Sequence, residues 1–131
     1  MDESLELKEV CRELREKGVS KERLKTMLSD KERFLRALKA VKKGKVKKYV
    51  FKPSGKVIWI VVGKKREYIV LPKISFCSCD DYYYRIMNDE VSLCYHLIAC
   101  WIAEATGKFD LIEEEDSLYD FLLGDWKKQT S

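Results

Sequence analysis

Four potential metal ligands in a fixed order constrain this sequence more than any other feature. Cys77 and Cys79 are separated by one residue, and after 14 further residues Cys94 and His96 repeat that spacing. Three thiolates and one imidazole form a complete tetrahedral zinc shell of the Cys₃His type. His96 is the only histidine of the chain, so its place two residues after a cysteine is a specific signal. The sequence therefore predicts one structural Zn²⁺ ion bound by these four side chains.

Two other interpretations of the same cysteines stay open at this stage. Buried cysteines often pack as small hydrophobic side chains, and the two pairs could instead form a disulfide. Intracellular disulfides occur in hyperthermophiles, and the surplus of Lys and Glu with one Asn and one Gln suggests a heat-adapted source. We expect the other two cysteines, Cys11 and Cys100, to pack in the core, because each lies on an apolar helix face.

The two ligand pairs impose different local geometries. In an extended segment Cys77 and Cys79 would lie about 6.6 Å apart, whereas two sulfurs on one zinc ion are about 3.8 Å apart. We therefore expect the regular strand to end near Phe76 and the chain to bend. On a helix, Cys94 and His96 would point to nearly opposite sides, so Cys94 should lie at or just before the first turn. Together the pairs predict a zinc-clamped β-to-α joint.

The hydrophobic pattern around this joint predicts an α+β fold. Helical spacing covers residues 7–17 and 24–41, with Ser20 as an N-cap and a capping box formed by Ser29 and Glu32. Gly18 and Gly44 follow these helices. Three strands at residues 46–51, 56–62 and 68–71 predict an antiparallel β-meander, and the apolar run at 56–62 indicates a central strand covered on both faces.

Two helices complete the prediction. One covers roughly residues 93–105, with Ser92 as a candidate N-cap and Gly107 beyond its end, and a short acidic helix covers roughly residues 116–123. We divide the chain into a helical N-terminal region, 1–44, and a zinc-binding domain, 45–131. Residues 1–20 lack the apolar stretch of a signal peptide, and no window is long and apolar enough to span a membrane. We therefore expect a cytoplasmic protein, with association with the nucleoid as a further expectation.

The charge of the chain is concentrated in its middle. Residues 31–66 carry 14 basic side chains and one acid, net +13, whereas residues 67–131 carry a net charge of −8. A basic block of this kind suggests a surface for nucleic acid or for an acidic protein partner, and a simple solvated face is the alternative. The candidate surface residues are Lys42, Lys43, Lys45, Lys47, Lys48, Lys64, Lys65 and Arg66.

The ligand motifs resemble those of a known family. The segments Phe76–Tyr82 and Leu93–Ala99, with their C-x-C and C-x-H pairs, are similar to the two halves of the SWIM zinc finger. The resemblance covers roughly residues 45–123 and implies a β-rich lead-in, zinc binding by the four ligands, and a module that binds DNA or protein. A short chain without an ATPase or nuclease motif is most similar to the small archaeal and eukaryotic SWIM proteins that pair with recombinase paralogs, as in the Shu complex. Tyr95 stands where a basic residue is common in the family.

Several residues near the ligands have two interpretations. Tyr82, Tyr83 and Tyr84 could stack on unpaired bases, but we favour packing around the zinc joint. Asp80 or Asp81 could orient His96 through its second ring nitrogen, or both could be solvated.

We do not expect an enzyme. Four protein ligands leave no open zinc position for water, and no phosphate loop, zinc-protease motif or nucleophile elbow occurs. The resemblance to the small SWIM proteins therefore implies a zinc adaptor that binds a RecA-like recombinase paralog, with DNA as a further partner and no small-molecule substrate or membrane. The alternative is a stand-alone nucleic-acid-binding zinc module.

Overall fold

The computed structural model describes residues 3–64, 66–74, 76–79 and 94–129. The helices and strands follow in the order α1 (Glu3–Glu16), α2 (Lys21–Ser29), α3 (Lys31–Lys42), β1 (Val46–Lys52), β2 (Lys56–Val62), β3 (Glu67–Leu71), η1 (Pro72–Ile74), β4 (Phe76–Cys77), α5 (Tyr95–Thr106), β5 (Asp110–Glu115), η2 (Asp116–Leu118) and α6 (Tyr119–Gln129). The predicted α+β class is confirmed. Among these described residues, no helix is both long and apolar enough to cross a membrane.

The N-terminal helices begin and end near the predicted residues, except that a different residue caps the start of α3. Ser20 caps α2 by accepting a hydrogen bond from the backbone N–H of Arg23 (3.1 Å). The predicted capping box of Ser29 with Glu32 is wrong, because Asp30 caps α3 and Ser29 is the last residue of α2. The Ser29 hydroxyl instead donates to the carbonyl of Thr26 (2.6 Å). A carboxylate between the two helices therefore replaces the serine as the cap.

The sheet has five strands rather than the predicted three. Its order is β4-β3-β2-β1-β5, in which the predicted meander β1-β2-β3 forms the centre. β5 pairs in parallel with β1, and β4 pairs with β3 over only two residues. The sequence analysis missed β5 because four of its six residues are acidic and give no apolar alternation. Such a polar strand is tolerated at an edge, where one side needs no partner.

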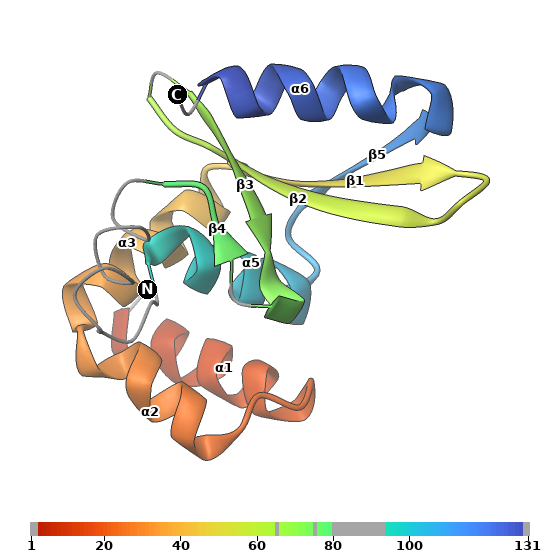
Figure 1. Cartoon of the computed structure of the whole chain (residues 1–131). Coiled ribbons are helices and arrows are strands. Elements are labelled where there is room, and N and C mark those ends of the chain that lie inside the picture. The colour runs from red at the N-terminus through yellow and green to blue at the C-terminus, as the bar shows by residue number, and fades with distance from the viewer. Residues whose placement is uncertain (1–2, 65, 75, 80–93, 130–131) are drawn as a thin grey trace.

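The two faces of the sheet carry separate hydrophobic clusters. Trp59 and Val61 of β2 face the larger cluster, which includes side chains of α1, α2, α3 and α5. Ile58 and Ile60, at the alternate positions, pack with Trp126 of α6. Figure 1 shows the resulting layers, with α6 on one side of the sheet and the other helices on the opposite side. β2 is thus covered on both faces as predicted, except at Val57, which is 40% exposed.

The larger cluster joins the two regions into which the sequence was divided. Leu14 of α1 and Phe34 of α3 are fully buried in the same cluster as Val46 of β1 and Ile102 of α5. The helices of the N-terminal region therefore form one wall of the core that supports α5. This places α3 beside the start of α5, where the predicted metal ligands lie.

The C-terminal helix differs from its prediction in position and length. We predicted roughly residues 116–123, whereas residues 116–118 form the 3₁₀ turn η2 and α6 extends from Tyr119 to Gln129. The acidic residues at the predicted start belong to the end of β5 and to this turn. Trp126, only 2% exposed, lies in the last turns of α6 and packs edge-on against Tyr49 of β1 at 4.9 Å. Burial of this tryptophan anchors the later residues as helix.

Candidate metal centre and its basic surround

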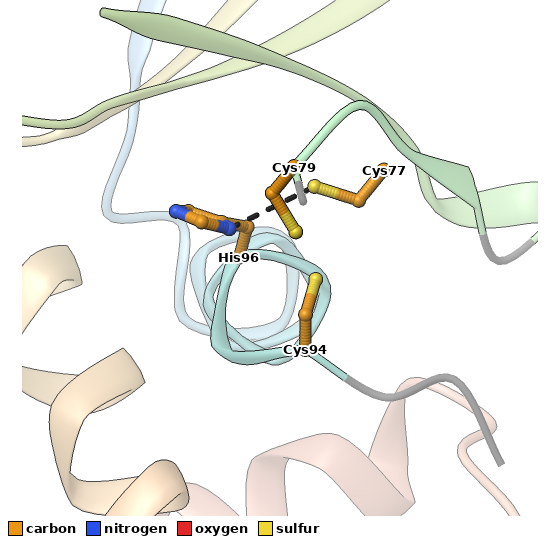
Figure 2. A group of neighbouring side chains, drawn as sticks. All are labelled: Cys77, Cys79, Cys94 and His96. Carbon is orange, nitrogen blue, oxygen red and sulfur yellow. Dashed lines mark hydrogen bonds between the residues drawn. The ribbon is translucent and has the colours of Figure 1, made fainter. Parts of the chain in front are cut away.

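The two halves of the ligand set meet between a strand end and a helix start. Cys77 is the last residue of β4, and Cys79 follows it by two residues. Cys94 is the N-cap of α5, with extended backbone angles (φ −69°, ψ 161°), and His96 lies in the first turn. Both placements confirm the predicted joint, while Ser92, the candidate N-cap, lies outside the described residues. Figure 2 shows the four side chains converging from these two segments.

The ligand atoms are close enough to share one ion. Three sulfurs and one imidazole nitrogen lie within 4.8 Å of one another, and all four side chains are buried. The Cys77 Sγ and the His96 Nδ1 are 3.7 Å apart. For zinc bond lengths of ~2.3 Å to sulfur and ~2.05 Å to nitrogen, the corresponding tetrahedral edge is about 3.6 Å. The donor set and its spacing therefore fit one Zn²⁺ ion, with Nδ1 as the histidine ligand.

The metal-free thiols hold their protons strongly. Hydrogen bonding with Cys79 and Cys94, together with burial, raises the pKa of Cys77. For Cys94, hydrogen bonding with Cys77 acts in the opposite sense, but hydrogen bonding with Cys79 and burial raise the pKa to about 12. Because zinc binds thiolates, uptake of the ion must release these protons.

Ser78, which the sequence analysis did not consider, fixes the bend between the first two ligands. Its backbone N–H donates to the carbonyl of Ile69 (3.0 Å), and its hydroxyl oxygen accepts from the backbone N–H of Ile69 (3.0 Å). Both backbone groups of one β3 residue are thus satisfied by a serine that is only 6% exposed. The sequence carries no signal of this role, because a serine is also a usual residue of a solvated turn.

The histidine ring packs against two aromatic rings. Its centroid lies 4.3 Å from that of Tyr68 and 4.0 Å from that of Tyr95. The second nitrogen, Nε2, is buried and has no hydrogen-bond partner among the described residues. Asp80 and Asp81, the predicted partners, lie outside those residues, as do Tyr82, Tyr83 and Tyr84.

The remaining cysteines are not part of the cluster. All five cysteines are free thiols, so the two ligand pairs do not form a disulfide. Cys100 is fully buried in the main hydrophobic cluster, and burial raises its pKa well above the ordinary value. Cys11 is partly buried against that cluster. Both therefore pack as predicted.

The predicted basic residues separate into several environments. Lys43, Lys45 and Lys64 line one hollow beside the metal ligands, whereas Lys42 lines a different one against α1. Strand alternation places Lys47 and Lys48 on opposite faces of β1. The Lys48 ammonium lies over the ring of Trp59 (5.4 Å). The backbone carbonyl of Arg66 accepts from Gly63 (2.8 Å) in the β2–β3 turn, and Lys65 lies outside the described residues.

The comparisons with known proteins agree with this centre. A scan against protein-family models found no match. A protein from Dictyostelium discoideum, "Zinc finger SWIM domain-containing protein 7 homolog", is 32% identical over 85 residues, which cover 63% of this chain and 54% of that protein. Together with the Cys₃His cluster, this match supports a SWIM-type zinc finger. The aligned region spans only about half of the Dictyostelium protein.

A second relative matches the chain over a similar extent. An uncharacterized protein from Archaeoglobus fulgidus is 37% identical over 87 residues, covering 66% of this chain and 67% of that protein. This chain and the archaeal protein belong to one family. The sequence motif, the cluster geometry and the named relative thus all support a SWIM-type zinc finger.

Proposed function

We propose that this chain is a non-catalytic zinc adaptor in homologous recombination or repair. It binds a RecA-like recombinase paralog and is brought to DNA through that partner. The observation that carries the proposal is the buried four-ligand cluster at the joint between β4 and α5. A centre with four protein ligands supplies rigidity rather than an open coordination position for chemistry. Its resemblance to small SWIM proteins that pair with recombinase paralogs supplies the partner class.

The metal joint is suited to an adaptor because it supports a fixed surface. The ion would link the end of β4 to the start of α5, and α5 is packed in turn against α1 and α3. Surface side chains on these elements then keep one geometry without help from a bound partner. A preorganised surface of this kind loses less conformational entropy on association.

A pulldown from cells of the source organism tests the adaptor. Tagged chain is captured with and without nuclease treatment, and the copurifying proteins are identified. A RecA-like ATPase recovered after nuclease treatment is the expected result, and it should be lost in a Cys77→Ser, Cys79→Ser variant but kept in Cys100→Ala. Absence of any such ATPase under both conditions would refute the adaptor.

A stand-alone nucleic-acid module is the second candidate function. It is favoured by the six basic residues that line one hollow next to the metal ligands: Arg33, Arg36, Lys39, Lys43, Lys45 and Lys64. Recovery of the ATPase that vanishes with nuclease would favour this candidate, because the contact would then pass through nucleic acid.

A further inference from the structure

A basic hollow of about 720 Å³ lies directly beside the metal ligands. Its walls come from α3, the start of β1, the β2–β3 turn and the start of α5. Six cationic side chains line it, and no acidic residue is among the described residues that do so. Cys79, Cys94 and His96 belong to the same lining. The hollow and the metal centre therefore share a wall.

The cations that line the hollow come from three segments of the chain. Arg36, Lys39 and Lys43 are spaced by three and four residues, so they lie on one face of α3 and its C-cap over about 10 Å. Lys45 directly precedes β1, where its backbone N–H donates to the carbonyl of Ala40 of α3 (3.1 Å), and Lys64 lies in the β2–β3 turn. A hydrogen bond from the N–H of Val62 to the carbonyl of Lys45 (2.9 Å) ties these two segments together.

Within the described part of the chain, these side chains are largely without acidic partners. Arg33 is the exception, since its guanidinium lies 3.8 Å from the carboxylate of Asp30. The other five cations surround a concave space rather than a flat surface. Low-dielectric walls around like charges concentrate the field, which attracts an anion into the space between them.

The aromatic rings in the wall are already in contact with other groups. The Arg36 guanidinium lies 4.4 Å from the centre of the Tyr95 ring, and that ring also packs against His96. Tyr68 packs against His96 as well. These contacts hold the Arg36 fork in place over the residue between the last two metal ligands. The hollow therefore presents cationic groups at fixed positions, whereas its aromatic rings already pack against other side chains.

We propose that this hollow binds the sugar-phosphate backbone of a single-stranded nucleic acid, without reading its sequence. This inference rests on the second candidate function. A concave space lined by cations from three segments can admit a thin, flexible strand, whereas a convex duplex would contact only its rim. Proteins that bind single strands without sequence preference usually combine a basic groove with stacking of bases on aromatic rings. Because the rings of this hollow already pack against other side chains, we expect binding through contacts to the phosphates, which carry no sequence information.

Binding of fluorescent oligonucleotides to the full chain tests the inference. The probes are an oligo(dT) strand of roughly 20 nucleotides and a duplex of equal length. Each phosphate contact on a single strand contributes a salt slope of ~0.7. In an Arg36→Gln, Lys39→Gln, Lys43→Gln variant, the slope should fall by about 2 and the affinity at ~0.1 M salt should fall about 100-fold.

A matched control separates local contacts from net charge. Lys17→Gln, Lys21→Gln, Lys25→Gln removes the same charge from exposed positions outside the hollow. Because these side chains do not line the hollow and exposed charges are screened by salt, this variant should bind within about threefold of the original chain. Zinc content and thermal melting are measured on every variant. If the α3 variant does not fold, Lys45→Gln, Lys64→Gln in the two other segments that line the hollow should lower the slope by about 1.4.

Three results would overturn the inference. Duplex binding as tight as single-strand binding would exclude the strand preference. Equal losses in the hollow variant and the control would exclude the hollow as the site. Absence of binding at roughly 100 micromolar protein and low salt would exclude nucleic acid and leave the hollow to an acidic protein surface. None of these results bears on the ATPase pulldown, so failure of the adaptor remains a separate outcome.

Discussion

Replacing Cys79 with serine tests whether one ion holds the joint between β4 and α5. Structural zinc contributes about 10–16 kcal/mol in small zinc modules, or ~2.5–4 kcal/mol for each of four ligands. At 1.4 kcal/mol for each factor of ten, loss of one thiolate should weaken zinc binding by about 10²–10³-fold. Because ordinary domains are stable by only about 5–15 kcal/mol, the melting temperature should also fall markedly.

The assay compares Cys79→Ser with Cys100→Ala, which truncates a buried thiol outside the cluster. Zinc per chain is measured by elemental analysis, and affinity by competition with a chromophoric chelator. Truncation of Cys100 should cost about 1 kcal/mol, which corresponds to a fall in melting temperature of ~3–5 °C with zinc content unchanged. The assignment is refuted if Cys79→Ser keeps full zinc affinity, or if Cys100→Ala loses the ion.

Four further predictions address the surroundings of the centre. Ser78→Ala should leave the buried N–H of Ile69 without its acceptor and cost about 1–3 kcal/mol, measured by denaturant unfolding, and an unchanged midpoint would contradict this role. Trp126→Ala should cost about 3–5 kcal/mol, which lowers the melting temperature by ~10–20 °C while the chain keeps its zinc, and loss of the ion would show that the two clusters are not separate. Zinc affinity should rise with pH over the range ~6–8, because Cys77 and Cys94 must release protons to bind the ion, and a flat competition titration would contradict it. The stability of the metal-free fold should show the opposite pH dependence. Thiols with raised pKa values stabilise this fold at pH values below the thiol pKa of the unfolded chain, ~8.5, and the contribution is lost as the pH rises further.

Much of the metal centre could be predicted because its determinants are local. The spacing of Cys94 and His96 is incompatible with two positions inside a regular helix, so the helix start was implied by the residues themselves. The observed N-cap at Cys94 confirms this reasoning. Helix ends marked by glycine were also predictable, because Gly44 and Gly107 adopt the left-handed conformation (φ 71° and 73°) that other residues avoid.

Other features depend on segments that are distant in the sequence. The pairing of β5 with β1 brings residues 110–115 beside 47–52, and the acidic composition of β5 carries no sign of it. Ser78 acquires its role only because Ile69 of β3 lies opposite.

The basic hollow shows the same division. The sequence alone determined that residues 31–66 carry a large positive charge, since charge is a property of composition. The packing of α3 against α5 and the β2–β3 turn decided which of those cations lie together. They bring Arg36 and Lys64 to one hollow beside the metal ligands. Long-range contacts of this kind arise from burial of a shared core, and burial is a property of the folded chain rather than of any local pattern.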